Sequence, residues 1–317
     1  MATFLIKRTV ILFPVLLGVS IVVFVALHLA PGNPAQMLLG PMATPSQLHA
    51  MSVQLGLNRP LVVQYVVWLG HLLTGDMGTS IMYHQSVRSL VFEKLGNTLV
   101  LTSVSFMLAS VFGIFVGIAS GFFRGTVLDH VLNVFSFVGL SVPVFWLGLL
   151  FILVFGLHFH MFPINGMYTI GDAETVGQVA NHLVLPAIAL AIAPGAVIAQ
   201  ITRVALIEEL NQQYMLTARS KGLTFWQAAV KHALRNAWIP VITTLGLEIN
   251  YLIGGDVLIE NVFSWPGVGQ LLVQSVLSRD YPVILGTTIV MSVIFVVVNL
   301  VVDVLYPILN PKVEADG

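Results

Sequence analysis

The chain has 317 residues, of which 57% are hydrophobic and only 9% are charged. A mean hydropathy of +0.95 excludes a soluble globular protein, because so few charges cannot cover its surface, whereas a bilayer requires no such cover. The net charge of −1 gives no sign of nucleic-acid binding, and the lack of cysteine excludes disulfides and thiolate metal sites. The sequence is therefore that of an integral membrane protein.

Six apolar segments are long enough to cross the hydrocarbon layer as helices. In lipid only helices and closed barrels satisfy the hydrogen bonds of the backbone. These runs lack the segments of about ten alternating apolar and polar residues that are typical of a barrel strand. We therefore predict an all-α membrane protein with six transmembrane helices. The predicted spans are Val10–Leu29, Thr98–Phe122, Val131–Phe155, Leu183–Ile201, Trp238–Ile259 and Pro282–Tyr306.

The first span follows Lys7 and Arg8, as the apolar core of a signal peptide would. Its apolar run of about 20 residues exceeds the roughly 7–15 of a typical signal peptide. The run ends in "ALHLAPG", which offers no good cleavage site. We therefore expect the first span to be retained in the mature protein.

Residues 31–96 form a long segment between the first two spans, and it has its own predicted helices. Thr44 is a suitable N-cap, with Pro45 at the first helical position. Further on, Tyr65 and Trp68 are mixed with aliphatic residues in "RPLVVQYVVWLGHLL". That mixture is typical of a helix at the membrane interface.

Histidines gather in this segment and at the neighbouring span ends. The pair in "LHFHMF", His158 and His160, would present two imidazoles to one metal ion if the backbone were extended. No third ligand lies at close spacing, so ordinary interfacial histidines are the simpler interpretation. The seven histidines on this side are His28, His49, His71, His84, His158, His160 and His182.

Residues 203–237, between the fourth and fifth spans, hold five of the thirteen lysines and arginines. Arg219 and Lys221 fall in the last turn of a predicted helix, where cations oppose the negative end of the helix dipole. Gly222 follows as an expected left-handed residue. Thr224 then opens a second helix with a Thr-x-x-Gln capping box.

The second helix is predicted to have an apolar face and a polar face. The apolar face contains Phe225, Ala229, Ala233 and Ala237, and the polar face contains Gln227, Lys231 and Arg235. A rigid helix–glycine–helix protrusion with a basic outer edge suits docking to a soluble partner. The alternative interpretation is that these cations only set the topology.

Carboxylates lie within or at the ends of the last two spans. Glu248 is the deepest, and it either lines a translocation pathway or hydrogen-bonds to a neighbouring helix, for example through Asn250. Asp256 and Glu260 are expected near the outer mouth, where water reaches them, either as part of the pathway or as ordinary exposed carboxylates. Near the inner end of the last span, Asp303 shares a face with Asn299 and is interpreted as structural.

A turn is predicted after the fifth span, in "SWPGVG". Pro266 and Gly267 favour a turn, and Trp265 is expected at the membrane interface.

The distribution of cations predicts the orientation. The end segments 1–9 and 307–317, with the loops 124–130 and 203–237, carry nine of the thirteen lysines and arginines. The positive-inside rule therefore places both termini in the cytoplasm and residues 31–96 outside.

The inner segment resembles a known family at specific residues. "TARSKGL" followed by "KHALRNAWIP" is similar to the cytoplasmic EAA loop of ABC-transporter permeases of the dipeptide, oligopeptide and nickel family. Thr217 and Ala218 match the start of that motif, and Gly222 matches its glycine. The chain departs from the wider permease pattern because its proline arrives only at Pro240, a departure typical of this branch.

The resemblance extends over nearly the whole chain. "LHLAPGNPAQMLLG", "LGLNRPLVVQYVVWLGHLLTGDMGTS", "IENVFSWPGVGQLL", "SRDYPVILG" and "VNLVVDVLYPILNPKV" occur in the family's order. It implies the ABC importer permease fold as a single transmembrane domain over 1–317, in a bacterial inner membrane. It also implies that residues 203–237 couple to an ATPase through Thr217, Ala218, Arg219, Lys221, Gly222, Leu223 and His232.

By this resemblance the chain is a transport subunit and not an enzyme, in an ATP-driven importer of dipeptides or oligopeptides. The implied partners are a second, homologous permease subunit forming a heterodimer, two cytoplasmic ATPase subunits and an extracytoplasmic solute-binding protein. The chain lacks a G-x-x-x-x-G-K-[ST] phosphate loop. ATP and Mg²⁺ are therefore expected on the partners, with no cofactor and no metal on this chain.

Three alternatives remain open. The same architecture imports nickel, metal chelates or glutathione-like compounds in related systems. A proton-coupled secondary transporter would use Glu248, Asp256 and Asp303 as a relay, although no internal repeat is evident. An intramembrane enzyme is disfavoured because "GLSVP" around Ser141 lacks the glycine that follows a nucleophile-elbow serine.

Overall fold

The computed structural model describes residues 2–29, 34–40, 42–54, 56–169, 171 and 175–309. Within those ranges, side chains are described except at 2–11, 34, 37, 38, 54, 303 and 305–309. The side chains of Lys7, Arg8 and Asp303, and all residues from 310 on, lie outside the described residues.

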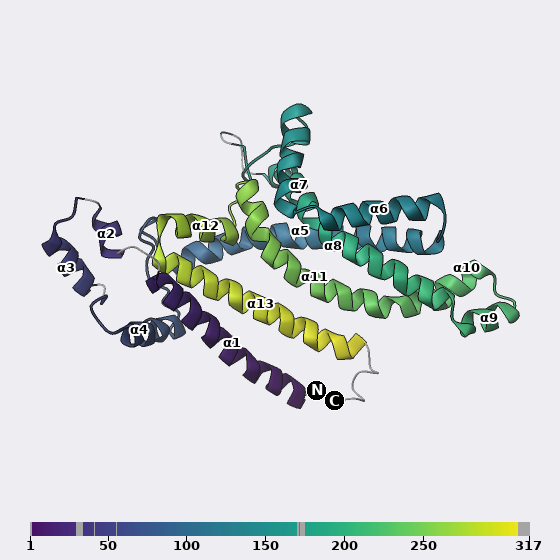
Figure 1. The fold of residues 1–317 in the computed structure, drawn as a ribbon, viewed down its shortest axis with the longest axis horizontal. Helices are drawn as coiled ribbons and strands as arrows, with labels where there is room; N and C mark the ends of the chain where they lie inside the picture. Colours follow the sequence, from purple (N-terminus) through teal and green to yellow (C-terminus); the bar gives the residue numbers. More distant parts are fainter. Residues whose placement is uncertain are drawn as a thin grey trace. The chain divides into compact units, whose positions relative to one another are not determined.

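The described residues are almost entirely helical, apart from one isolated β-bridge between Thr79 and Ser86 (Figure 1). Two short π-helical stretches, η1 and η2, interrupt the α-helices. The elements are α1 (Ala2–Leu29), α2 (Pro34–Leu39), α3 (Pro45–Gln54), α4 (Leu61–Leu73), α5 (Val87–Phe122), α6 (Val127–Ser141), α7 (Val144–Phe151), η1 (Ile152–His158), α8 (Val176–Leu210), α9 (Gln213–Ser220), α10 (Phe225–Ala228), η2 (Ala229–Ala233), α11 (Leu234–Val262), α12 (Val268–Ser278) and α13 (Tyr281–Leu309).

Five described helices are long and apolar enough to cross a membrane, and a sixth candidate is the bent pair formed by α6 with α7 and η1. The predicted all-α membrane fold is therefore confirmed. The third predicted span is not one straight helix, because its two halves meet at 104°. Val142 is extended there, with φ −92° and ψ 125°, as expected for a residue that precedes a proline, Pro143. The predicted cytoplasmic placement of both termini stays a prediction.

The chain forms two compact units, one of residues 1–97 and 266–297 and the other of residues 98–265 and 298–317. In the first unit α4 packs on α1 through aromatic side chains: the Phe24 ring lies 5.3 Å from that of Tyr65 and 5.8 Å from that of Trp68. The hydroxyls of Tyr65 and Ser20 are 2.7 Å apart. The predicted helix around Tyr65 and Trp68 is confirmed.

The first unit also confirms a predicted cap. Gln47 N donates to Thr44 Oγ1 at 3.4 Å, and Thr44 N donates to Gln47 Oε1 at 2.9 Å. Elsewhere in the unit, the buried carboxylate of Asp280 accepts hydrogen bonds from Ser80 Oγ at 2.5 Å and Met82 N at 3.0 Å. That contact fixes the loop before α5 to the turn between α12 and α13.

In the second unit α8 is the central helix, and it packs against α6, α7 and α11. Part of α5 also packs on α8 through a stripe of glycines four residues apart, Gly113, Gly117 and Gly121. A Cβ atom added at Gly113 would lie 2.6 Å from the Gly195 carbonyl oxygen, and one added at Gly117 would lie 2.5 Å from that of Ala199. Such small-residue stripes let membrane helices approach closely. The sequence interpretation did not use this motif.

Candidate docking site

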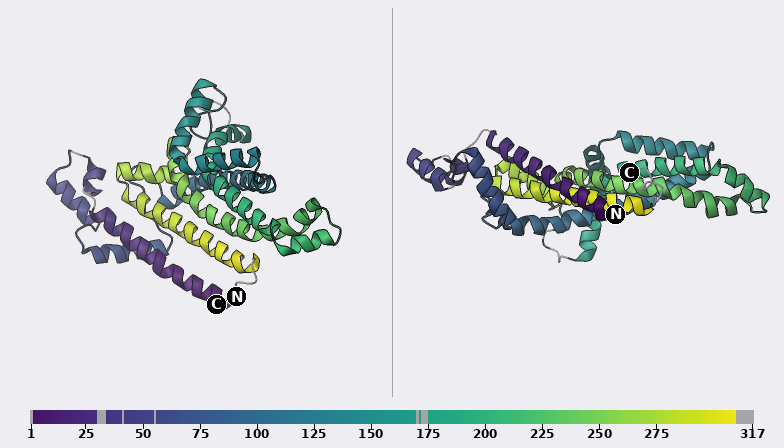
Figure 2. Two further views of the ribbon diagram at one scale, coloured as in Figure 1. Left: turned by 45° about the vertical axis from the view of Figure 1, so that its right-hand side comes forward. Right: turned by 90° about the horizontal axis from the view of Figure 1, so that it is seen from below.

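The helix–glycine–helix segment, residues 213–237, projects beyond the ends of α8 and α11 in all views of the second unit (Figures 1 and 2). α9 ends at Ser220, and Gly222 follows with φ +94°. Thr224 and Gln227 then form a reciprocal capping box, with N···O distances of 3.3 and 3.0 Å. The predicted left-handed glycine and the predicted cap are both confirmed.

The inner side of the segment and the end of α8 together form an alanine-rich cluster, called the root. Its buried members are Ala205, Leu206, Met215, Ala228, Ala229, Ala233 and Ala237. The assignment of Phe225 to the buried apolar face is wrong, because this side chain is 39% exposed. It stands at the first residue of α10, where its ring packs on Trp226 at 5.6 Å rather than on the root.

A polar contact joins the segment to its two supporting helices. Glu209 in α8 accepts hydrogen bonds from Tyr214 Oη at 2.6 Å and from Asn236 Nδ2 at 3.4 Å. The pKa of Tyr214 is raised to about 12, mainly by burial and to a smaller extent by the hydrogen bond to Glu209. The His232 ring lies 6.4 Å from that of Tyr214, edge to face. The segment is therefore held by both apolar packing and directed hydrogen bonds.

The residues singled out in this segment divide between the root and the outer surface. Ala218, Leu223 and His232 are half-buried, and the first two pack on the root. The outer residues, all exposed, are Thr217, Arg219, Lys221 and Gly222.

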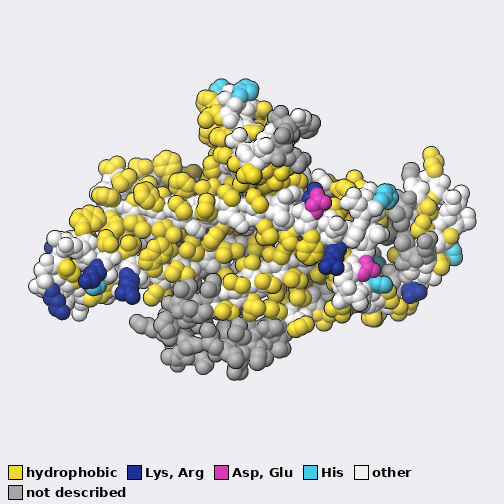
Figure 3. All heavy atoms as spheres, turned by 180° about the vertical axis from the view of Figure 1, so that it is seen from behind, with side chains coloured by type: hydrophobic (Ala, Val, Ile, Leu, Met, Phe, Trp, Pro, Cys, Tyr) yellow, Lys and Arg dark blue, Asp and Glu magenta, His cyan; other side chains and the backbone are white. Residues whose placement is uncertain are grey.

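Apolar side chains accompany these outer cations. Leu216 is 66% exposed and Val230 is 57% exposed. In Figure 3 the cations of the second unit that are visible gather around the tip formed by α9 and α10. The outer surface therefore combines positive charge with apolar area, a combination suited to a protein partner.

One cation of the inner segment does not belong to its basic edge. Arg203 pairs with Asp129 of α6, with a shortest N···O distance of 2.7 Å. Arg203 lies in α8, ten residues before the helix–glycine–helix segment begins at residue 213. It therefore holds α8 to α6 rather than facing a partner.

Two predicted pathway carboxylates are more enclosed than expected. Asp256 and Glu260 are both 0% exposed within this chain, which overturns the expectation that water reaches them. The reason is that threonines of α5 cover and bond them: Thr98 Oγ1 donates to Glu260 Oε1 at 2.5 Å, and Thr102 Oγ1 donates to Asp256. Their assignment to a translocation pathway stays a prediction.

Glu248 is half-buried in α11. The amide considered as its partner, Asn250, donates instead to Asn299 Oδ1 at 3.0 Å. That bond agrees with a structural role for Asn299.

The structure bears on the conditional metal pair of His158 and His160 and on the expected position of Trp265. His158 ends a π-helical stretch, and His160 has φ +52°, so the pair is not on an extended strand. Among the described residues, no group of three or more metal-binding side chains comes together. Trp265 is fully buried rather than interfacial, and it packs with Phe263 and Ile259.

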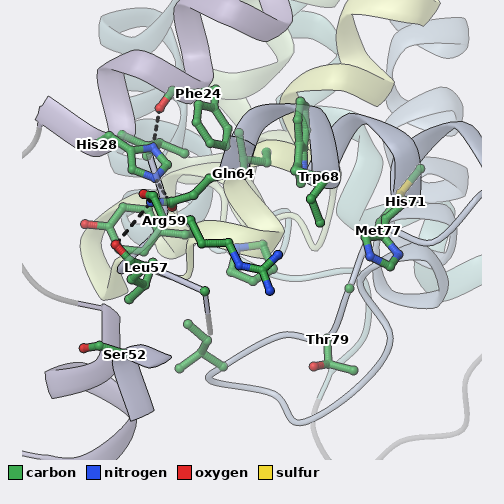
Figure 4. A pocket seen from close by; sticks show the side chains of 18 of the residues that line it. Phe24, His28, Ser52, Leu57, Arg59, Gln64, Trp68, His71, Met77 and Thr79 are labelled. Carbon is green, nitrogen blue, oxygen red and sulfur yellow. Dashed lines mark hydrogen bonds between the residues drawn. The ribbon is translucent and has the colours of Figure 1, made fainter. Parts of the chain in front are cut away.

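The first unit holds a cavity of about 1000 Å³ between α1, α3, α4 and the loop before α5 (Figure 4). Gln64 fixes one wall, because it contacts His28 Nε2 at 3.2 Å and donates to the carbonyl oxygen of Arg59 at 2.8 Å. His71 lies 3.4 Å from Asp76 in another part of the lining. The lining therefore combines aliphatic, aromatic and polar side chains, with Arg59 as its one permanent cation among the described residues.

Comparison with known proteins places this architecture in a family. A family described as "Binding-protein-dependent transport system inner membrane component" matches residues 109–315, and the family of its N-terminal part matches residues 1–102. The "Oligopeptide transport system permease protein AppB" of Bacillus subtilis is 40% identical over 99% of this chain and 100% of its own length. The "Glutathione transport system permease protein GsiC" of Salmonella choleraesuis is 39% identical over 99% of each chain.

A solved structure gives the same fold. The methionine ABC transporter MetNI, in inward-facing conformations, superposes with a TM-score of 0.56 at 20% identity, over 70% of this chain and 96% of that chain. The chain therefore belongs to the family of binding-protein-dependent transport system inner membrane components, the multi-pass ABC-transporter permeases that work with an ATPase and a binding protein.

Proposed function

We propose that the chain is a permease subunit of an ATP-driven importer of dipeptides or oligopeptides. The names of relatives that match from end to end support the peptide class. The observation that carries the mechanism is the helix–glycine–helix segment: a capped, hydrogen-bonded projection whose outer surface is cationic and apolar. Such a projection transmits movement because it is attached to two long helices at once.

In this proposal the segment docks on a cytoplasmic ATPase subunit. Its stiffness comes from short-range contacts: the capping box of Thr224 stops α10 from fraying, and the bond between Tyr214 and Glu209 fixes α9 to α8. Closure of the ATPase pair around ATP then moves α8 and α11 together. The chain alternates between inward- and outward-facing states whose populations the nucleotide controls.

The partners and cofactors follow from the same proposal. ATP and Mg²⁺ bind to two ATPase subunits, and this chain holds no cofactor and catalyses no reaction. A second, homologous permease completes the pathway as a heterodimer, and an extracytoplasmic binding protein delivers the substrate. Glutathione, which the name of one relative specifies, is itself a tripeptide and is the main alternative substrate.

Reconstitution with single omissions tests the proposal. The complete complex in proteoliposomes, supplied with its binding protein, tri-alanine and ATP, should accumulate tri-alanine. Omission of ATP, of the ATPase subunits or of the second permease should abolish accumulation, and glutathione in a parallel assay distinguishes the two substrates. Accumulation driven by a proton gradient in liposomes that hold this chain alone would contradict the proposal and support a secondary transporter.

A further inference from the structure

One buried carboxylate in the second unit collects hydrogen bonds from four parts of the chain. Asp129 of α6 is 3% exposed. Arg203 of α8 donates to it twice, from Nε at 2.7 Å and Nη2 at 2.8 Å. Ser120 Oγ of α5 donates at 2.5 Å, Gly125 N of the α5–α6 turn at 2.9 Å, and Asn133 Nδ2 of α6 at 2.6 Å. Asp129 therefore ties α5, the turn and α6 to α8.

This cluster lies next to the root of the helix–glycine–helix segment. Leu206, one helical turn beyond Arg203, belongs to the root. A Cβ atom added at Gly121 would lie 3.0 Å from Leu206 Cδ2, so the end of α5 touches the root directly. The Phe122 ring is also 5.0 Å from that of Trp226 in α10.

The two kinds of contact do different physical work. Apolar packing between α5 and the root is not directional, so it permits small sliding movements. A bidentate pair between a guanidinium and a carboxylate is directional and fixes one geometry. Because the Asp129 side chain is buried, separating the pair would leave a buried carboxylate without its cation. The pair therefore holds α6 and α8 in a single register.

We propose that the Asp129–Arg203 pair is a positioning element that makes α5 and α6 follow α8 when the helix–glycine–helix segment moves. The inference rests on the proposed docking function of that segment. It adds that the movement of α8 is transmitted to the α5–α6 turn through this pair, so that α5, α6, α8 and α11 move as one body. The competing interpretation, that Arg203 only sets membrane topology, requires a cation at this place but not its partner.

A double variant separates coupling from folding. Asp129→Asn combined with Arg203→Met removes both charges, so neither is left buried and unpaired. The complete complex carrying it should assemble and hydrolyse ATP, but tri-alanine imported per ATP should fall about tenfold, within the usual range for coupling between sites. Arg124→Met is the matched control, because it removes an exposed cation from the α5–α6 turn. The control should leave the ratio unchanged.

The outcomes are distinct. A normal ratio in the double variant would overturn the inference. Failure of the double variant to assemble would also overturn it, because the pair would then be required for folding. An equal loss in Arg124→Met would favour the topology interpretation. If the unmodified complex imports neither tri-alanine nor glutathione, the proposed function fails, and a second measurement tests the inference independently.

The second measurement needs no transport. The chain has no cysteine, so spin labels on Arg124→Cys and Gln213→Cys report one distance, between the α5–α6 turn and the start of α9. In the complete complex with the pair intact, addition of ATP and Mg²⁺ should leave this distance unchanged. With the double variant, the same addition should shift or broaden it. Identical behaviour in both proteins would refute the inference.

Discussion

The glycine stripe of α5 gives a prediction whose magnitude follows from the structure. In Gly117→Ala, the new Cβ atom would lie 2.5 Å from both the Ala199 carbonyl oxygen and the Thr202 Cβ atom. Ordinary contacts begin at 3.4 Å, and the carbonyl belongs to a helix backbone that cannot turn aside. α5 and α8 must therefore separate locally. Overpacking of this kind costs about 1–3 kcal/mol.

The matched control lies in the same helix. Gly96 has nothing within 4 Å of an added Cβ atom, so Gly96→Ala keeps only the gain in helix propensity, up to about 1 kcal/mol. Gly117→Ala has the same gain, which offsets part of its cost. We therefore expect the two variants to differ by about 1–3 kcal/mol, with Gly117→Ala the less stable.

Thermal inactivation in detergent provides the assay. The purified protein is heated, and the fraction that still elutes as a single monodisperse peak is measured against temperature. The midpoint should fall by several degrees for Gly117→Ala and should stay level or rise for Gly96→Ala. Equal midpoints for the two variants would refute the close approach of α5 and α8 at this residue.

Three further predictions concern single contacts. Tyr214→Phe removes a hydrogen bond to the Glu209 carboxylate and should lower the free energy of unfolding by about 1–2 kcal/mol. Because the folded-state pKa of Tyr214 is raised to about 12, the stability that this bond contributes is present below about pH 10 and is lost as the pH rises through 12. Equal unfolding midpoints for the variant and the unmodified protein at pH 8 would contradict it. Thr224→Ala removes the capping box and should cost about 1 kcal/mol, seen as amide exchange in α10 that is about fivefold faster; unchanged exchange would show that the cap is unnecessary. Asp280→Ala leaves the buried hydroxyl of Ser80 without its acceptor, so limited proteolysis of the loop before α5 should become faster, and an unchanged cleavage rate would contradict that.

Local signals in the sequence predicted the features that depend on near neighbours. The caps at Thr44 and Thr224 and the positive φ of Gly222 are decided within four residues, so composition and spacing suffice. The long apolar runs likewise predicted the helices. The 104° bend within the third predicted span also has a local signal in Pro143, which the length of the apolar run concealed.

Contacts between distant residues were not predictable in this way. From the sequence, Arg203 is interpreted as a cation that sets the membrane topology. In the structure it pairs with Asp129 of α6, which is 74 residues away in the sequence. Asp256 and Glu260 read as exposed carboxylates until two threonines of α5 cover them. Trp265 reads as interfacial because tryptophan is common there, but the turn after α11 folds it into the core.

The most direct test of the docking role is the coupling of ATP hydrolysis to uptake in a complex carrying Gly222→Val. Gly222 has φ +94° and nothing within 4 Å of an added Cβ atom, so the substitution strains only the turn between α9 and α10. Gly40→Val is the control, because Gly40 has φ +81°, equally open surroundings and a place far from the segment in the sequence. Gly222→Val complexes should assemble and hydrolyse ATP but import about tenfold less tri-alanine per ATP, while Gly40→Val complexes should couple normally. Normal coupling in Gly222→Val complexes would contradict the docking role of the segment.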